Sequence, residues 1–339
     1  MLDIMTKTGI IGPGLIWQRT HREILSTLAQ ELPVAAYAAR SPENRKLAGE
    51  SYPQATAYSD AAALIADPEV QAVVILTPIH LNAPMALLVL EAGKHAIVEK
   101  PVARSLAEAR ELFEVEKRSQ GTLYILEQHP HKSLIPVVKG LFRQGAAGRP
   151  VAFERAVHVQ IDVANDSTGG FGSTPWRQVP DYPLGNFFDG GIHEVALLQM
   201  LFGPPEAVFA AGQSLRETFG DVDQLSMVIR YPGAVHGVFS HSSSLGLQGN
   251  HFVIHGTEGV VTVTDREVTL RRNGADQPVK SIPVPWHQES VAMWQEIADA
   301  LPSGSPGIYH RREALADLAF MDAVQKSLDS EKMEMVSGE

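Results

Sequence analysis

A lysine at the predicted end of a strand is the first residue of this chain that is well placed for chemistry. The run Gly93–Pro101 reads GKHAIVEKP, so a short apolar segment ends on Glu99 and Lys100 and a proline follows. Ligands of open α/β sheets bind at the carboxyl ends of the strands. An ammonium group at that place could stabilise negative charge that develops on a substrate oxygen. The alternative is that Lys100 only pairs with Glu99.

Asp189 and His193 form a second candidate pair. They are four residues apart in a segment whose apolar spacing indicates a helix that ends at Gly203, so both side chains should lie on one side of that helix. An imidazole can accept a hydroxyl proton at neutral pH, and a nearby carboxylate can orient it or hold the substrate. Taken alone, the spacing also fits a surface pair.

A glycine-rich turn near the start of the chain predicts a dinucleotide site. Residues 9–17 read GIIGPGLIW, in which Gly12 allows a tight turn and Gly14 allows the backbone to approach a pyrophosphate. The pattern is G-x-G-x-x-W, because Trp17 occupies the position of the usual third glycine. We expect contacts to the cofactor from Gly12, Pro13, Gly14, Leu15 and Ile16.

The end of the second predicted strand bears on the choice of coenzyme. An acidic residue there would bind the ribose hydroxyls of NAD, but this chain has Arg40 and Ser41. A guanidinium and a hydroxyl can bind a 2'-phosphate, so NADP(H) is favoured over NAD(H). The alternative is that Arg40 is a solvated loop residue and that selectivity is weak.

The elements that must position these residues alternate between short apolar runs and helix-length amphipathic stretches, a pattern typical of βαβ units. Strands are predicted at Thr8–Ile11, Pro33–Ala38, Ala55–Ala57, Ala72–Leu76, His95–Val98 and Thr122–Leu126. Helices are predicted at Leu15–Gln30, Pro42–Glu50, Asp60–Ala66, Ala83–Ala92 and Leu106–Ser119. We therefore expect residues 1–127 to form a Rossmann domain with a doubly wound parallel sheet.

The second half of the chain has a different pattern. A helix is predicted near Ser133–Gly145, and alternating apolar and polar runs separated by turn residues indicate a large, mostly antiparallel sheet. The strand runs are Val151–Ile161, Gln224–Tyr231, Ala234–Ser240, His251–His255, Gly259–Thr264 and Glu267–Arg271, and a last helix covers Arg311–Leu328. We expect an α+β domain at 128–330 for substrate binding and oligomerisation, and a flexible tail at 331–339 that frays after Ser330.

Composition excludes several classes of function. The chain has 339 residues, a formal net charge of -11 and no cysteine, which argues against nucleic-acid partners, disulfides and thiolate zinc sites. We see no secretion signal and no apolar run long enough to span a membrane, and we expect a cytoplasmic protein. The pairs His129/His131 and His251/His255 have no identifiable third ligand, so no metal site is predicted.

Three features together resemble the glucose-fructose oxidoreductase, inositol dehydrogenase and MocA (Gfo/Idh/MocA) family. They are the glycine-rich turn, Thr77-Pro78 after the fourth strand, and Glu99-Lys100-Pro101 after the fifth. The segment from Ala72 to Asn82 is similar to the family consensus, with Ile79 and Asn82 in place of the usual Asn and His. The resemblance covers nearly the whole chain.

The resemblance implies an NAD(P)-dependent dehydrogenase or reductase that acts on CH-OH groups of a sugar, cyclitol or related polyol. It makes Lys100, His193 and Asp189 catalytic, with His193 as the acid/base and Asp189 as its companion in substrate binding. It also implies a homodimer or homotetramer through the open second sheet. Two alternatives are a non-catalytic sensor of dinucleotide and sugar, and an NAD-recycling lyase or glycosidase on the same fold.

The remaining predicted contacts follow from position in the chain. We expect Thr77, Pro78, His80, Glu99, Lys100 and Gln128 to contact the coenzyme. Trp176 and Arg177, with Tyr182, could line the substrate pocket, since an indole face stacks on sugar C–H groups and a guanidinium can hold a hydroxyl; the alternative is a structural loop anchored by one buried Trp. The family often has an Asp where this chain has Ala196, which would remove one polyol contact.

Overall fold

The chain divides into two compact units. The computed structural model describes residues 5–159, 170–245, 249–285 and 287–337. The first unit comprises Met1–Gln128 and Ser290–Ala314, and the second comprises His129–Glu289 and Leu315–Glu339. The first unit therefore extends one residue past the expected limit of 127 and takes in a later segment that the sequence analysis assigns to the second domain. This segment carries Met293, Trp294 and Ile297, which are buried in the core of the first unit.

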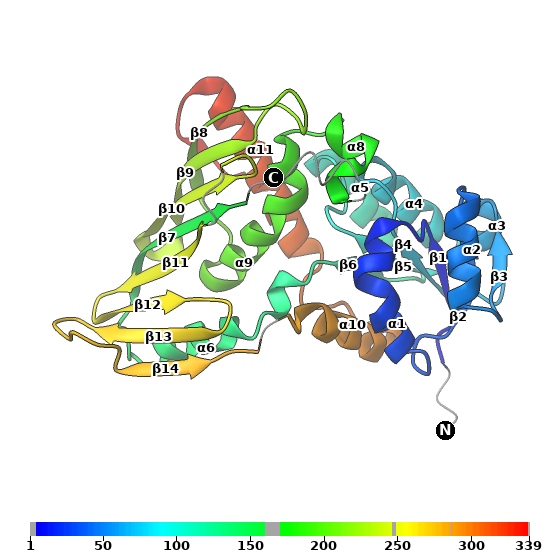
Figure 1. Ribbon diagram of the computed structural model, residues 1–339, viewed down its shortest axis with the longest axis horizontal. Coiled ribbons are helices and arrows are strands. Elements are labelled where there is room, and N and C mark those ends of the chain that lie inside the picture. Colours follow the sequence, from blue (N-terminus) through cyan, green and yellow to red (C-terminus); the bar gives the residue numbers. More distant parts are fainter. Residues whose placement is uncertain (1–4, 160–169, 246–248, 286, 338–339) are drawn as a thin grey trace. The chain divides into compact units, whose positions relative to one another are not determined.

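A six-stranded parallel sheet forms the centre of the first unit, in the order β3-β2-β1-β4-β5-β6 (Figure 1). The strands are β1 Thr8–Ile11, β2 Val34–Ala38, β3 Thr56–Tyr58, β4 Ala72–Ile75, β5 His95–Glu99 and β6 Leu123–Leu126. Four of them (β1, β4, β5 and β6) are buried at every position apart from half-buried His95, as expected for strands covered on both faces. The predicted doubly wound Rossmann sheet is confirmed.

Helices on this sheet are η1 Trp17–His21, α1 Arg22–Thr27, α2 Pro42–Ser51, α3 Ala61–Ala66, α4 Ile79–Glu91, α5 Leu106–Glu116, α10 Glu289–Ala300 and η6 Leu301–Ser303. The side chains of Ser41, Asp60 and Ser105 cap the helices that follow them, because each accepts a hydrogen bond from a first-turn amide. The α4 helix begins at Ile79, four residues before the predicted start, and includes Pro84 near its beginning.

The first predicted helix is divided into a π-helical turn, η1, and a short α-helix, α1. Trp17 begins the π turn and is fully buried. Its indole N–H donates to the hydroxyl of Tyr52 over 3.3 Å, and its ring belongs to the core that also contains Trp294. The indole thus packs inward, where the usual glycine would leave space for helix and strand to approach.

A nine-stranded sheet dominates the second unit, in the order β14-β13-β12-β11-β7-β10-β9-β8-β15. The strands are β7 Pro150–His158, β8 Ala207–Gln213, β9 Gln224–Tyr231, β10 Val235–Ser242, β11 Gly249–Gly256, β12 Gly259–Val263, β13 Glu267–Arg272, β14 Lys280–Pro283 and β15 Glu334–Met335. Only β7 and β10 pair in parallel among these neighbours. The mostly antiparallel second sheet is therefore confirmed.

Helices cover one face of this sheet. The helices of this unit are α6 Leu134–Arg143, α8 Pro175–Gln178, η4 Phe187–Gly191, α9 Ile192–Phe202 and α11 Arg311–Ser330, and its short turns include η2 His129–His131, η3 Phe171–Ser173 and η5 Pro232–Ala234. Gln199 of α9 donates to Asp317 of α11 over 2.7 Å, and Ser327 of α11 accepts from the amide of Ala210 in β8 over 2.9 Å. These bonds tie the two long helices to each other and to the sheet.

The end of the chain corrects one expectation. The sequence predicts a tail that frays after Ser330, but Glu334 and Met335 form β15 and pair with β8. The hydroxyl of Ser327 donates to the carbonyl of Lys332, which turns the chain back toward the sheet. The free edge of β8 then supplies the backbone partners that an isolated tail would lack.

Candidate active site

The glycine-rich turn has the geometry that a dinucleotide requires. Gly12 has φ 75°, and a Cβ on it would lie 2.9 Å from the carbonyl oxygen of Leu76, so only glycine fits there. A Cβ on Gly14 would meet no protein atom closer than 3.8 Å, which leaves its outer side open. Pro13 is buried, whereas Leu15 and Ile16 are half-buried and lead into η1. These residues fit a pyrophosphate bound at the turn.

Arg40 and Ser41 follow β2, and Ser41 has several partners. Its hydroxyl accepts from the amide of Asn44 over 3.3 Å and donates to the carboxylate of Glu43 over 2.5 Å. This hydrogen bond lowers the pKa of Glu43. Arg40 is exposed. A carboxylate is therefore present beside the hydroxyl that the sequence analysis assigns to a 2'-phosphate.

Lys100 lies directly after β5 and is held through its neighbours. Asn82, which is 1% exposed, donates to the carbonyl oxygens of Glu99 and Pro101, each over 2.9 Å. The hydroxyl of Thr77 donates to the side-chain oxygen of Asn82 over 3.0 Å. The Lys100–Pro101 peptide bond is cis. Asn82, which differs from the usual His of the resembled family, thus links the end of β4 to the backbone around the lysine.

Residues at the ends of neighbouring strands come together in the first unit. Strands β1, β4, β5 and β6 are adjacent and parallel, so their carboxyl ends share one edge of the sheet. A Cβ on Gly12 would lie 3.5 Å from Thr77. Pro78 precedes α4, His80 lies in its first turn, and Gln128 ends the unit after β6.

The second unit contains Asp189 and His193 in continuous helical backbone. Asp189 lies in the π-helical turn η4 and His193 in the first turn of α9. A Cβ on Gly191, between them, would overlap the ring of Phe187 at 2.2 Å. A glycine is therefore needed for the turn to pack in this way.

Asp189 has a cationic partner. The Arg177 Nε donates to Oδ2 of Asp189 over 2.6 Å, and both side chains are largely buried. The guanidinium carbon of Arg177 lies 4.0 Å from the ring centre of Trp176, within the range of a cation–π contact. Arg177 thus covers one face of the Trp176 indole.

His193 has an aromatic neighbour that the sequence analysis does not assign to catalysis. The rings of His193 and His129 are stacked, with centres 4.8 Å apart. Nδ1 of His129 lies 3.9 Å from Oε1 of Glu194, and Oε2 of Glu194 accepts from Nε of Arg155 over 2.7 Å. Burial raises the pKa of Glu194, but the charges of Arg155 and then His129 outweigh burial and lower it to about 2. A stable carboxylate therefore faces the histidine stack.

Tyr182 and Ala196 are both inside the second unit. Tyr182 is 8% exposed and stacks on Phe188 with ring centres 5.5 Å apart; burial, followed by the charge of Asp189, raises the pKa of its hydroxyl. Ala196 is fully buried. A carboxylate at position 196 would be buried away from water, which is costly unless the charge is paired. Alanine fills this position without that cost.

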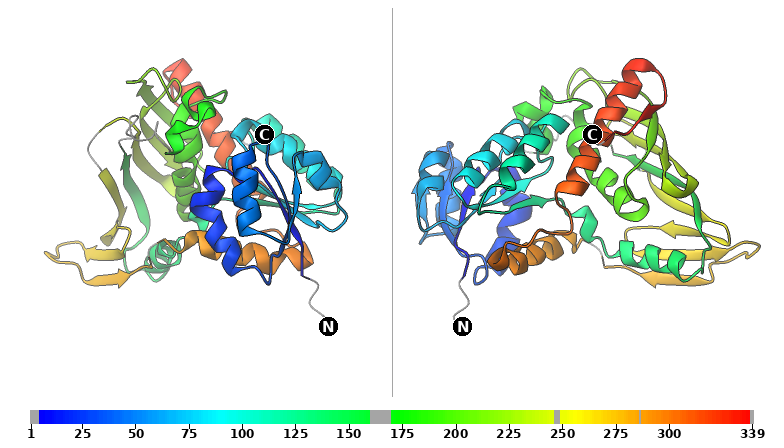
Figure 2. Two further views of the ribbon diagram at one scale, coloured as in Figure 1. Left: turned by 45° about the vertical axis from the view of Figure 1, so that its right-hand side comes forward. Right: turned by 180° about the vertical axis from the view of Figure 1, so that it is seen from behind.

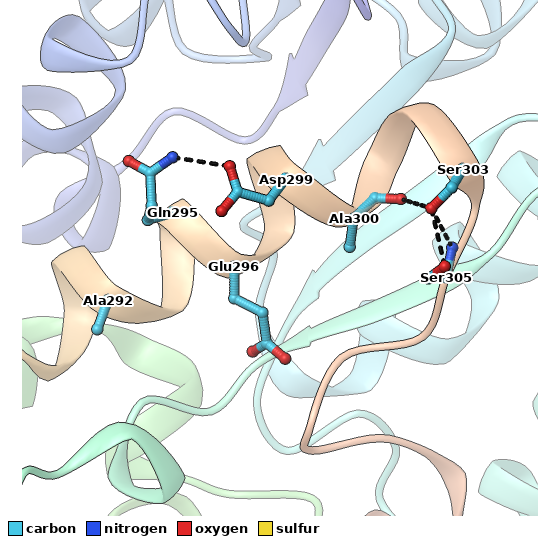
Figure 3. A pocket seen from close by; sticks show the side chains of 7 residues that line it. All are labelled: Ala292, Gln295, Glu296, Asp299, Ala300, Ser303 and Ser305. Atoms are coloured by element: carbon cyan, nitrogen blue, oxygen red, sulfur yellow. Dashed lines mark hydrogen bonds between the residues drawn. The ribbon is translucent and has the colours of Figure 1, made fainter.

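A shallow hollow of about 560 Å³ lies along α10, away from the predicted residues. Figure 3 shows its lining, in which Gln295 donates to Asp299 over 3.0 Å and the hydroxyl of Ser303 donates to the carbonyl of Ala300 over 3.0 Å. The opposite side of the same helix carries Trp294 in the core.

Within the described ranges, none of the helices is both long and apolar enough to cross a membrane. No set of three or more His, Cys, Asp or Glu in those ranges is arranged as a metal site.

Two family models match the chain. Residues 6–127 match the oxidoreductase family with an NAD-binding Rossmann fold, and residues 137–262 match the GFO/IDH/MocA C-terminal domain. The chain belongs to the GFO/IDH/MocA oxidoreductase family. The resemblance inferred from the sequence is thereby confirmed, and the protein is an oxidoreductase.

Relatives of this GFO/IDH/MocA member include trans-1,2-dihydrobenzene-1,2-diol dehydrogenase of Mus musculus, which is 32% identical over 75% of this chain and 73% of its own length. An uncharacterized oxidoreductase of Rhizobium meliloti is 27% identical over 98% of this chain and 99% of its own. An oxidoreductase from Thermotoga maritima is similar in structure, with a TM-score of 0.89, 25% identity and 98% of both chains covered. Levoglucosan dehydrogenase in complex with NADH has a TM-score of 0.84 at 21% identity and covers 98% of this chain and 99% of its own.

Within this GFO/IDH/MocA chain, sequence reasoning did not assign roles to several residues around the predicted ones. His21 bonds Glu99, and Trp294 bonds His21. His129 stacks on His193 and lies close to Glu194, which pairs with Arg155. In the sequence, His129 has the spacing of half of a His129/His131 pair. Of His21, His129 and Arg155, only Arg155 lies in a mostly apolar run, Val151–Val157, which is a signal for a buried charge. His21 and His129 lie in polar stretches and carry no such signal.

Proposed function

We propose that this protein is an NAD(P)-dependent dehydrogenase that transfers hydride between nicotinamide C4 and the secondary alcohol or hemiacetal carbon of a sugar, cyclitol or related polyol. The observation that carries the proposal is the position of Lys100. It follows β5 at the same sheet edge as the glycine turn, and Asn82 fixes the backbone on both sides of it. An ammonium at that edge is suited to stabilising charge on a substrate oxygen.

His193 is proposed as the group that takes the proton. During oxidation the hydroxyl proton passes to the imidazole, the C–H bond gives up its electron pair, and a carbonyl forms. Lys100 stabilises the oxygen during this change. A bound nicotinamide coenzyme would supply the hydride acceptor.

Asp189, Arg177 and Trp176 are proposed to form the polyol-binding wall. Arg177 and Asp189 offer a donor and an acceptor that hold each other in place over 2.6 Å, and Trp176 offers an apolar ring face. Polyols present both hydroxyls and C–H groups, so this combination suits them. The diol named for the mouse relative and the sugar derivative named for levoglucosan dehydrogenase belong to the same broad class.

NADP(H) is proposed as the favoured coenzyme. Support comes from exposed Arg40 after β2, where the chain lacks the acidic residue typical of NAD sites. The carboxylate of Glu43 beside Ser41 would repel a 2'-phosphate, so we expect only a moderate preference for NADP(H) over NAD(H). Glu99 is proposed to support Lys100 rather than to touch the coenzyme, because its carboxylate has two protein partners.

The test combines coenzyme titration with a substrate panel. Fluorescence titration compares NADPH with NADH, and coenzyme absorbance then scores trans-1,2-dihydrobenzene-1,2-diol, levoglucosan, inositols and ketoses. Lys100→Met and His193→Asn should each lower turnover by about 100-fold or more while the coenzyme affinity stays nearly unchanged. Lys94→Met, at the other end of β5, is the matched control and should keep wild-type turnover. Near-normal turnover in both active-site variants would contradict the assigned roles.

Location and assembly stay predictions. We expect a cytoplasmic homodimer or homotetramer formed through the nine-stranded sheet. The sheet carries Phe209, Val228 and Val238 with 37%, 42% and 51% of their surface exposed, and the three are neighbours across β8, β9 and β10. Exposed apolar side chains in one row are typical of a contact surface.

A further inference from the structure

A buried chain of hydrogen bonds runs from α10 to the backbone of Lys100. The indole N–H of Trp294 donates to Nδ1 of His21 over 3.0 Å. Nε2 of His21 lies 2.7 Å from Oε1 of Glu99, and Oε2 of Glu99 accepts from the amide N–H of Lys100 over 3.0 Å. Trp294, His21 and Glu99 are 0%, 2% and 7% exposed. Figure 2 shows α10 beside the helix that begins after His21.

The bonding pattern determines the protonation of His21. An indole N–H can only donate, so Nδ1 of His21 must present a lone pair to Trp294. The ring proton is then on Nε2, from which it is donated to Glu99. His21 is therefore a neutral imidazole, and its contact with Glu99 is a hydrogen bond from a neutral donor to a carboxylate.

Each oxygen of Glu99 has a defined partner. A buried carboxylate is costly unless hydrogen bonds satisfy it, and here His21 satisfies one oxygen while the Lys100 amide satisfies the other. The carbonyl groups of Glu99 and Pro101 are bonded to Asn82. Asn82 thus holds the carbonyl groups before and after Lys100, and the Glu99 carboxylate holds its amide. The Glu99 carboxylate is in turn held by His21.

We infer that His21 and Trp294 are positioning residues that fix Lys100 through Glu99. Trp294 is 273 residues away from His21 in the sequence, so the segment 290–314 of the first unit contributes to the arrangement of the lysine. The two rings also pack edge to face, with centres 5.6 Å apart. This inference rests on the proposed role of Lys100.

Substitution of His21 tests the inference. His21→Leu removes both hydrogen bonds, whereas His21→Gln can accept from Trp294 through its amide oxygen and donate to Glu99 through its amide nitrogen. Single-turnover hydride transfer, with the best substrate of the panel above, should be about tenfold or more slower in His21→Leu, with NADPH affinity within about twofold of wild type. His21→Gln should restore most of the rate. His95→Leu is the matched control, because His95 bonds the amide of Thr122 at the opposite end of β5, and it should leave the rate unchanged.

Nitrogen NMR of the His21 ring provides a test that needs no catalytic activity. In the wild-type protein Nε2 should carry the proton and Nδ1 should not, and Trp294→Phe should shift the Nδ1 signal toward that of a lone pair without a donor. A proton on Nδ1 in the wild-type protein would overturn the inference. So would a folded His21→Leu variant that transfers hydride at the wild-type rate, or failure of His21→Gln to recover any rate. A wild-type protein that oxidises no polyol would instead refute the proposed function, and the NMR result would still report on the hydrogen-bond chain.

Discussion

Asn82 allows the contribution of one buried side chain to the Lys100 site to be measured. Asn82→Ala removes the donors to the carbonyls of Glu99 and Pro101 and the acceptor of the Thr77 hydroxyl. Asn82 is 1% exposed, so water has little access to replace these partners. The variant should therefore both destabilise the first unit and loosen the backbone around Lys100.

The size of the effect follows from these three hydrogen bonds. A buried hydrogen bond contributes about 1 kcal/mol net, and an unsatisfied buried partner costs about 1–3 kcal/mol. We expect Asn82→Ala to lower the free energy of unfolding by about 3 kcal/mol, equivalent to a change of about 100-fold in the unfolding equilibrium. Asn273→Ala, which removes one exposed bond to the carbonyl of Thr257, should cost less than about 1 kcal/mol and serves as the control.

Urea unfolding followed by tryptophan fluorescence measures the stability, and single-turnover hydride transfer measures the effect on the site. Both quantities should fall in Asn82→Ala, and neither should change substantially in Asn273→Ala. A loss below about 1 kcal/mol in Asn82→Ala would show that the carbonyls find other partners, and the argument for Asn82 as the link between β4 and Lys100 would fail.

Three further predictions concern pH, coenzyme and assembly. Burial lowers the pKa of His241 from 6.5 to about 4. Between these two pH values the unfolded chain binds one more proton than the folded protein, so the free energy of unfolding should fall as pH falls through this window. Urea unfolding near pH 7 and near pH 4 measures this fall, and His241→Gln should make it smaller by about 3 kcal/mol. Arg40→Ala should weaken NADPH binding about tenfold, and Glu43→Gln should strengthen it several-fold, with NADH little affected in either variant, as fluorescence titration can measure. Val238→Asp should shift the assembly toward monomers in light scattering, because it places a charge in the exposed apolar row with Val228; an unchanged mass would argue for a contact surface elsewhere.

Much of the fold could be predicted from the sequence because local signals and burial agree in the first unit. The apolar runs of β1, β4, β5 and β6 are buried almost throughout, and the helices between them start at capping residues such as Ser41 and Ser105. Less visible elements were missed. The strand β14 at Lys280–Pro283 is mostly exposed and has no strong periodic pattern. The helix α10 was missed although its buried residues Met293, Trp294 and Ile297 recur at helical spacing.

The sequence names the proposed site residues but not the contacts between them. The motif positions give Gly12, Lys100 and His193 directly. Sequence spacing could not show that Arg177 bonds Asp189 or that His129 stacks on His193, because these pairs are separated by loops whose paths depend on packing.

The order of residues along the chain determined which strands form, where the glycine turn lies, and that a lysine follows a buried strand. These properties are local, since they depend on side-chain periodicity and on backbone freedom within a few residues. Tertiary structure decided which side chains support that lysine. Asn82 and His21 bond the Glu99–Lys100 segment from two separate elements, and Trp294 bonds His21 from a third. Burial forces each polar group there to find a partner that proximity in sequence does not supply.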